Sequence, residues 1–129
     1  MKQKIIKSVI VAPSRVPEIK EIENKLEVLQ GTVGGWIEVL PLEEGICLIC
    51  NEEGKLDQLP LNRGLHNEEG ELWEIIAGTF IVVGEDIEKG EFISLTDEQA
   101  EYIKEKFYYP ELFMKVDGKI VSQKLPFLF

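Results

Sequence analysis

Short runs rich in isoleucine and valine recur along the chain, and each is bounded by proline, glycine or acidic turn residues. This pattern predicts β-strands. We expect strands at residues 4–12, 36–42, 46–50 and 78–84. Residues 17–22 have no clear period, and we interpret them as a further strand because the asparagine that follows them is a good helix N-cap.

Two segments carry apolar residues at helical spacing. The first helix is expected to begin after Asn24, which fits a capping box with Glu27. It should end at Gly31 or at Gly34 and Gly35, because glycine suits a helix C-cap. Its predicted buried face consists of apolar residues three or four positions apart, namely Leu26, Leu29 and Val33.

The second helix is expected to open at Thr96, which forms a capping box with Gln99, and to continue to about Tyr108. Its inward face carries apolar side chains, namely Ala100, Ile103 and Phe107. Its outward face carries an acidic stripe, namely Asp97, Glu101 and Glu105.

The remaining segments are turns, loops and one hairpin. Asp117 and Gly118 separate the apolar stretches 113–116 and 119–122, which is a strong β-hairpin signal. Residues 51–54 form a turn, and Lys55 and Leu56 begin a return strand. We expect an irregular loop at 60–70 and a short helical or extended piece at 73–76.

These elements predict an α+β fold, with a mostly antiparallel sheet of about five or six strands, two helices and a C-terminal β-hairpin. A chain of 129 residues can build one core but not two independent domains, so we expect a single domain over 1–129. The apolar end, 125–129, should dock on its own domain or, by preference, on a neighbouring subunit. The C-terminal region is therefore expected to build a homo-oligomer.

The chain has no apolar run approaching the roughly 20 residues needed to span a bilayer. The short apolar run near the N-terminus is interrupted by Lys4 and Lys7, and we interpret it as a strand and not as a signal peptide. We therefore expect a cytoplasmic protein that does not bind membranes.

The formal net charge is −10, and it is unevenly distributed. Residues 68–105 contain twelve acidic and two basic residues, whereas the rest of the chain carries twelve of each sign. This balance disfavours direct nucleic-acid binding through a basic face. An acidic surface usually serves solubility, and less often it imitates the phosphate backbone for a basic partner.

Cys47 and Cys50 form a C-x-x-C pair within a strand-like run. A redox pair requires its first cysteine at a helix N-terminus, and a structural zinc site requires about four ligands. In a strand, positions three apart face opposite sides. We therefore predict two buried thiols, with no metal and no cofactor.

Nothing in the sequence resembles a catalytic apparatus. His66 is the only histidine, and we expect it in an exposed polar loop. Paired glutamates occur only in predicted turns, where burial cannot separate the two pKa values as a two-carboxylate mechanism requires. We therefore expect a binding protein and not an enzyme.

Several residues are candidates for ligand binding. Arg63, one of two arginines, could clamp a phosphate with Asn62 in the expected loop, or form a surface ion pair. Trp36 follows two glycines and could stack a base, although a core tryptophan at a strand start is the favoured alternative. Thr79 beside Gly78 could hold an anion or simply enter a strand.

Four segments occur in an order that resembles a known family. They are Gly34–Glu38, Cys50–Leu56 (which includes Asn51), Leu59–Arg63 and Ile76–Phe80. The sequence resembles the family called Domain of Unknown Function 3846 over residues of about 4–95. This resemblance implies an origin in phages or mobile elements of Gram-positive bacteria, but it implies no activity.

We hypothesise an oligomeric, non-enzymatic sponge that sequesters a small anionic ligand, such as a cyclic nucleotide immune signal, to counter host defence. Its expected ligand-binding residues are Trp36, Asn51, Asn62, Arg63 and Thr79. The alternative is an acidic DNA mimic or decoy that binds a host nucleic-acid-binding or restriction factor.

Overall fold

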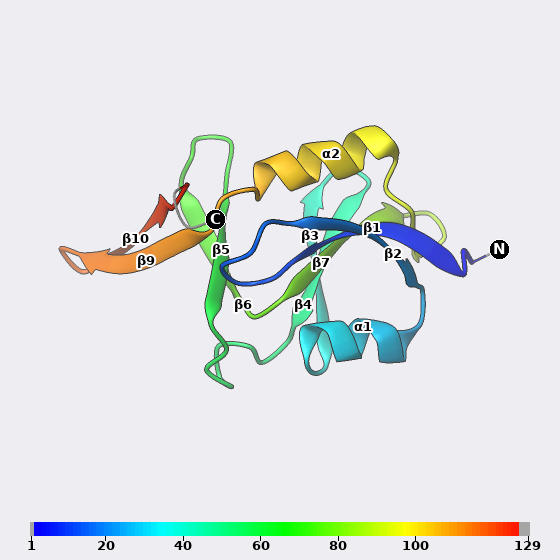
Figure 1. Cartoon of the computed structure of the whole chain (residues 1–129), viewed down its shortest axis with the longest axis horizontal. Coiled ribbons are helices and arrows are strands. Elements are labelled where there is room, and N and C mark those ends of the chain that lie inside the picture. The colour runs from blue at the N-terminus through cyan, green and yellow to red at the C-terminus, as the bar shows by residue number, and fades with distance from the viewer. Residues whose placement is uncertain (1, 127–129) are drawn as a thin grey trace.

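The architecture was determined as a computed structural model, which describes residues 2–126. Six strands form one antiparallel sheet in the order β2-β1-β7-β4-β3, with β8 paired to β7 (Figure 1). Their bounds are β1 (Ile5–Val11), β2 (Glu18–Glu23), β3 (Ile37–Glu43), β4 (Ile46–Asn51), β7 (Phe80–Asp86) and β8 (Glu91–Ile93).

The two helices lie on opposite faces of this sheet, α1 (Leu26–Val33) on one and α2 (Asp97–Lys106) on the other (Figure 1). Two hairpins complete the fold. The first pairs β5 (Leu61–His66) with β6 (Leu72–Ala77), and the second pairs β9 (Glu111–Val116) with β10 (Lys119–Lys124). The predicted α+β class, with its mostly antiparallel sheet, two helices and C-terminal hairpin, is confirmed.

The hydrophobic core has two parts because both faces of the sheet are covered. On the α2 side, Val82, Phe80 and Leu48 pack with Ile103 and Phe107 of the α2 region. On the α1 side, the buried set is Ile6, Ile22, Leu29, Val33, Cys47, Ile49, Ile81 and Val83. All six residues of β4 are buried, which explains why its first five residues, 46–50, are apolar without alternation.

The C-x-x-C pair lies within β4, as its strand-like context indicates. Cys47 belongs to the core on the α1 side and Cys50 to the core on the α2 side, so the two thiols face opposite sides of the sheet. Both are free and buried.

Local signals located α2 and the C-terminal hairpin correctly. Thr96 and Gln99 form the predicted capping box. At the tip of the hairpin, Asp117 and Gly118 both have positive φ angles, 52° and 79°, as a two-residue turn of this kind requires. The C-cap of α1 is also as expected, since Gly34 has φ 84° and its N–H donates to the Gln30 carbonyl.

The predicted start of α1 is wrong. Lys25 is the N-cap and makes no side-chain capping bond. The Asn24 side chain instead donates to the carbonyl oxygens of Gln3 (3.1 Å) and Phe92 (3.3 Å), which ties the entry of α1 to β8. Leu26, predicted to be buried, is 51% exposed. The Asn24 side chain therefore makes tertiary hydrogen bonds and does not cap α1, contrary to the prediction from the local pattern.

The region after β4 also differs from expectation. Residues 60–70 are not an irregular loop, because 61–66 form β5, and 72–77 form its partner β6. Lys55 and Leu56 lie within consecutive turns at residues 52–58, so they do not begin a strand. The pairing of β5 with β6 is interrupted by two register shifts, which is why neither strand carries a clean alternating pattern.

Two further expectations concern the membrane and the C-terminus. Within residues 2–126, no helix has the length and apolar character needed to cross a bilayer.

The Leu125 N–H donates to the Pro110 carbonyl at 2.8 Å, which returns the chain to the base of the second hairpin. Residues 127–129, the rest of the expected docking segment, lie outside the described residues.

Candidate functional site

Arg63 lies on β5 and is fully enclosed by the fold, with 0% exposure. Its guanidinium donates to the backbone oxygens of Phe107 (3.0 Å) and Arg15 (2.7 Å) and to the Asn62 side-chain oxygen (2.9 Å). Burial lowers its pKa to about 10, and the negative charge of Glu111 acts in the opposite direction. In this arrangement the guanidinium serves the protein's own backbone and does not face a ligand.

Asn62 is 1% exposed and belongs to the same buried hydrogen-bond cluster as Arg63. We refer to these two residues and their hydrogen bonds as the buried joint. Its side-chain nitrogen donates to the carbonyl oxygens of Val11 (2.8 Å) and Gly78 (2.9 Å). These bonds attach the β5–β6 hairpin to the end of β1 and the approach to β7. Asn62 and Arg63 therefore hold the hairpin, the main sheet and the end of α2 together.

Trp36 and Thr79 do not join Arg63 in a common site. Trp36, directly before β3, is 70% exposed, so the favoured interpretation as a core tryptophan is wrong. Thr79 is half-buried, and the preceding Gly78 donates its N–H to the Pro60 carbonyl at 2.7 Å. That N–H is consequently engaged and is not offered to an anion.

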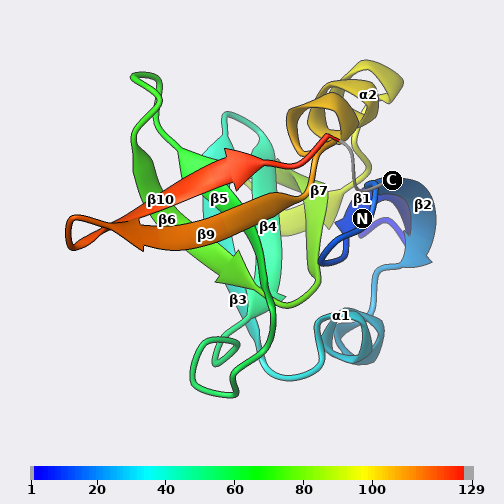
Figure 2. The ribbon, with the colours of Figure 1, turned by 60° about the vertical axis from the view of Figure 1, so that its left-hand side comes forward.

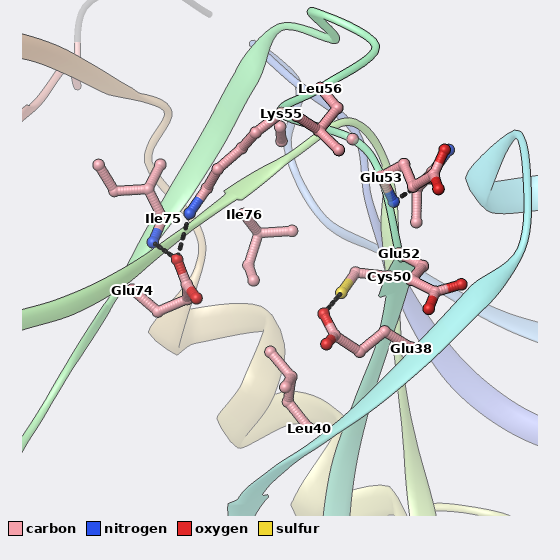
Figure 3. A pocket seen from close by; sticks show the side chains of 13 residues that line it. Glu38, Leu40, Cys50, Glu52, Glu53, Lys55, Leu56, Glu74, Ile75 and Ile76 are labelled. Carbon is pink, nitrogen blue, oxygen red and sulfur yellow. Dashed lines mark hydrogen bonds and ion pairs between the residues drawn. The ribbon is translucent and has the colours of Figure 1, made fainter.

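Asn51, the fifth expected site residue, lines a pocket of about 180 Å³ between β3–β4 and β6 (Figure 3). Its own polar atoms are engaged, since it donates to the Val33 carbonyl (3.3 Å) and accepts from the Glu53 N–H (2.8 Å). It holds the 52–59 turn segment in place and so shapes the rim of the pocket.

Acidic side chains dominate this pocket. Its lining includes four glutamates and one lysine: Glu38, Glu52, Glu53, Glu74 and Lys55. Figure 3 shows Glu38 on the β3 wall and Glu74 on the β6 wall, with the apolar floor between them. The local charge balance is therefore negative, and we refer to this feature as the acidic pocket.

Each wall of the acidic pocket holds its carboxylate by hydrogen bonds. On the β6 wall, Glu74 pairs with Lys55 and accepts from the Ile75 N–H at 2.9 Å. Burial would raise the pKa of Glu74, but these two partners together lower it below its ordinary value. On the β3 wall, the Cys50 thiol donates to Glu38 Oε1 at 3.8 Å.

The thiol in this pocket is not a nucleophile near neutral pH. Burial, followed by the charge of Glu38, raises the pKa of Cys50 to about 12. A thiol must ionise to react, so Cys50 stays protonated and acts as a hydrogen-bond donor. No cluster of three or more histidine, cysteine or acidic residues in the part of the chain that the structure describes could hold a metal ion.

A second pocket, of about 330 Å³, lies between β5, the end of α2 and the base of the β9–β10 hairpin. Its lining includes two lysines, one glutamate and one histidine, namely Lys106, Lys124, Glu111 and His66. Glu111 accepts from the Gly64 N–H at 3.2 Å through Oε2, whereas its buried Oε1 has no partner among residues 2–126. With two lysines against one glutamate, we refer to this feature as the basic pocket.

The acidic stripe of α2 is exposed as predicted, but it is not wholly free. Asp97 pairs with Lys7 of β1, and this partner lowers the pKa of the carboxylate. The neighbouring Tyr102 hydroxyl donates to Glu43 of β3 at 3.0 Å. These contacts fasten α2 across the sheet, so part of the acidic charge has a structural role.

Fold and site together define an α+β protein with a side-chain-sized acidic pocket at the junction of two sheets. The family model for the domain of unknown function DUF3846 matches residues 6–108. The chain belongs to this family. The match extends through α2, further than the expected limit near residue 95, and ends before β9 begins. No curated protein and no solved structure matches the chain.

Three of the four segments that carry the family resemblance meet at the acidic pocket. All of its lining residues except Leu40, Glu74 and Ile75 come from Gly34–Glu38, Cys50–Leu56 and Ile76–Phe80. The fourth segment, Leu59–Arg63, supplies the buried joint of Asn62 and Arg63 described above.

Sequence reasoning assigned no site role to the ionisable residues that surround both pockets. Glu74 and Lys55 are 19 positions apart and come together only through the fold. Glu38 could have been found, because it is a charged residue between the apolar residues Ile37 and Val39 of β3. His66, Lys106 and Lys124 lie on three different elements, and no local spacing connects them.

Proposed function

We propose that this protein is a non-enzymatic binding protein that engages a basic partner protein, with the acidic pocket receiving a lysine or arginine side chain. The observation that carries the proposal is the set of four carboxylates around a pocket built mainly by the family-like segments. Carboxylates bind ammonium and guanidinium groups by charge-assisted hydrogen bonds.

The size of the pocket supports a side chain over a nucleotide. Pockets for drug-sized ligands are roughly 300–1,000 Å³, and the acidic pocket has about 180 Å³. An apolar cavity of about 150 Å³ accommodates a benzene-sized group. A single arginine or lysine side chain is therefore the better fit.

Exposed aromatic and aliphatic groups beside the pocket suit a protein partner. Trp36 is 70% exposed, and its carbonyl pairs with the N–H of Glu52 at the pocket rim. Leu56, on the rim itself, is 81% exposed. Tryptophan beside a carboxylate can also stack on a bound guanidinium. In a phage or mobile-element setting, the partner would be a host nucleic-acid-binding or restriction factor that this acidic decoy occupies.

An arginine-rich peptide titrated calorimetrically into the protein tests this proposal. Glu38→Gln combined with Glu74→Gln keeps the side-chain shapes and should weaken binding roughly tenfold or more, since hydrogen bonds to charged groups contribute about 1.5–3 kcal/mol. Glu27→Gln, an exposed residue on α1, is the matched control. Equal affinity for all variants, or no binding by the wild type, would contradict the proposal.

A second candidate function is sequestration of a small anionic ligand, such as a cyclic nucleotide immune signal. The observation that favours it is the basic pocket, whose volume of about 330 Å³ falls within the small-ligand range and whose lining includes Lys106 and Lys124. It supplies the local positive charge that a phosphate ligand needs in an acidic chain.

A thermal-shift series against linear and cyclic nucleotides tests this second candidate. Binding should raise the melting temperature of the wild type. Lys106→Ala combined with Lys124→Ala should abolish that shift, whereas Lys89→Ala, in the exposed turn after β7, should retain it. A shift that survives loss of both lysines would place the ligand elsewhere.

A further inference from the structure

The β9–β10 hairpin has two unlike faces. Directly opposed residues of an antiparallel pair point to the same side, and Leu112, Met114 and Val116 oppose Gln123, Val121 and Lys119. These six residues form one face, which we call the outer face. Its four apolar side chains are between 38% and 49% exposed.

The opposite face of the hairpin is directed at the protein's own β5–β6 hairpin. Glu111 accepts from the Gly64 N–H, and Ser122 Oγ lies 3.4 Å from His66 Nε2. Figure 2 shows β9 and β10 crossing in front of β5 and β6. The base of this side is therefore in contact with the body, although Ile120, nearer the tip, is 49% exposed, and the outer face is directed away from the body.

A hairpin with this exposed apolar face is expected to pack against another surface. A two-stranded hairpin is marginally stable without packing on its faces, and contiguous exposed apolar groups mark interaction surfaces. The sheet contains only β9 and β10, so each has one edge without a strand neighbour among the described residues. The hairpin also lies outside residues 6–108, the part of the chain that matches the family.

Charge distribution favours a second copy as the occupant, because this hairpin is a place where two copies of an acidic chain can meet without repulsion between carboxylates. The chain carries −10, so two copies repel each other over most of their surfaces. The outer face carries no carboxylate, and its only charged residue is Lys119. From Glu111 to Lys124 there are three lysines against two acids, which is the reverse of the balance of the whole chain.

We infer that the outer face of the β9–β10 hairpin is a self-association surface, which packs on the same face of a second copy around a two-fold axis. Isologous pairs of this kind are the commonest form of homo-oligomer. The pairing buries Leu112, Met114, Val116 and Val121 from both copies, and none of these residues lines the acidic pocket. It is independent of either proposed ligand.

Light scattering after size-exclusion chromatography of the full chain tests this inference. The wild type should have the mass of a dimer. Met114→Lys combined with Val121→Lys should give the monomer mass, because it places charge at the centre of the apolar face. Ile87→Lys, which replaces an apolar residue that is 70% exposed in the turn between β7 and β8, should remain dimeric.

Cysteine cross-linking separates this geometry from association elsewhere. Met114→Cys or Val121→Cys should be joined across the dimer by a short bis-maleimide cross-linker, because sheets packed face to face lie about 10 Å apart, beyond the reach of a direct disulfide. Ile87→Cys should remain uncross-linked, and the native thiols are buried. A monomeric wild type, or a dimer that persists in the double lysine variant and is not cross-linked at either position, would overturn the inference.

Discussion

At the scale of single residues, the buried joint gives the sharpest prediction. Arg63→Ala removes a fully enclosed side chain and leaves the carbonyl oxygens of Phe107 and Arg15 without their donor. We expect the free energy of unfolding to fall by about 3–5 kcal/mol, from the cavity and the unpaired oxygens together. Urea unfolding followed by circular dichroism measures this loss.

The control for this prediction is Arg15→Ala. The Arg15 side chain is exposed, and the joint uses only its backbone oxygen, so the free energy of unfolding should change by no more than about 0.5 kcal/mol. If Arg63→Ala were as mild as Arg15→Ala, the buried hydrogen bonds would not support the fold.

The two thiols give a prediction about alkaline pH. Burial raises the pKa of both Cys47 and Cys50 from 9.0 to about 12. Between those values the folded state holds protons that the unfolded state releases, so stability is full below pH 9 and decreases as the pH rises toward 12. The lowered pKa of Arg63, about 10, opposes this loss only above pH 10.

Denaturant unfolding between pH 8 and 11, for the wild type and for Cys47→Ala combined with Cys50→Ala, measures this effect. The double variant should have a lower free energy of unfolding at pH 8 and a shallower decrease above pH 9. Parallel curves for the two proteins would show that the thiols do not cause the alkaline loss.

Arg63 shows how far a sequence can indicate a site. The scarcity of arginine singled out Arg63, but both expected roles, a phosphate clamp or a surface ion pair, differ from the buried position that the side chain has. Its two backbone partners could not be predicted, because these acceptor oxygens belong to residues 48 and 44 positions away. A guanidinium has the same donors for a phosphate and for a carbonyl oxygen, so only the fold decides which of them it meets.

At the scale of elements, α2 depends on a cap that was visible in the sequence. The Thr96 hydroxyl oxygen accepts from the Gln99 N–H at 3.1 Å, and the Gln99 side-chain oxygen accepts from the Thr96 N–H at 2.9 Å. Thr96→Ala should reduce the free energy of unfolding by about 1 kcal/mol, and Thr96→Ser should largely restore it. Glu101→Ala, at an exposed position of the same helix, is the control; an equal loss there would mean that the cap contributes nothing specific.

Elements were predictable where their signals were local. The α2 cap and the Asp117 and Gly118 turn each depend on residues within four positions, and both were located correctly. The β5–β6 hairpin was missed, because its register shifts and its buried Arg63 conceal the strand pattern. The Asn24 cap failed for a related reason, since the side chain makes tertiary bonds instead.

At the scale of the whole molecule, the two inferred interactions should respond to salt in opposite directions. A basic partner is attracted to a chain of net charge −10, whereas two copies of that chain repel each other except at the apolar hairpin face. Raising the ionic strength from about 0.01 M to 1 M shortens the Debye length from about 30 Å to about 3 Å. Screening should therefore weaken binding of the arginine-rich peptide and strengthen the dimer.

Titrations of both interactions over this salt range measure the contrast. The dissociation constant for the peptide should rise with salt and that of the dimer should fall, since burial of the apolar face is not screened. The monomeric variant Met114→Lys with Val121→Lys should keep the salt-sensitive binding of the peptide. A dimer that dissociates as salt rises would mean that ion pairs join the copies, and the lysines of the hairpin would then be bound to acidic groups of the second copy.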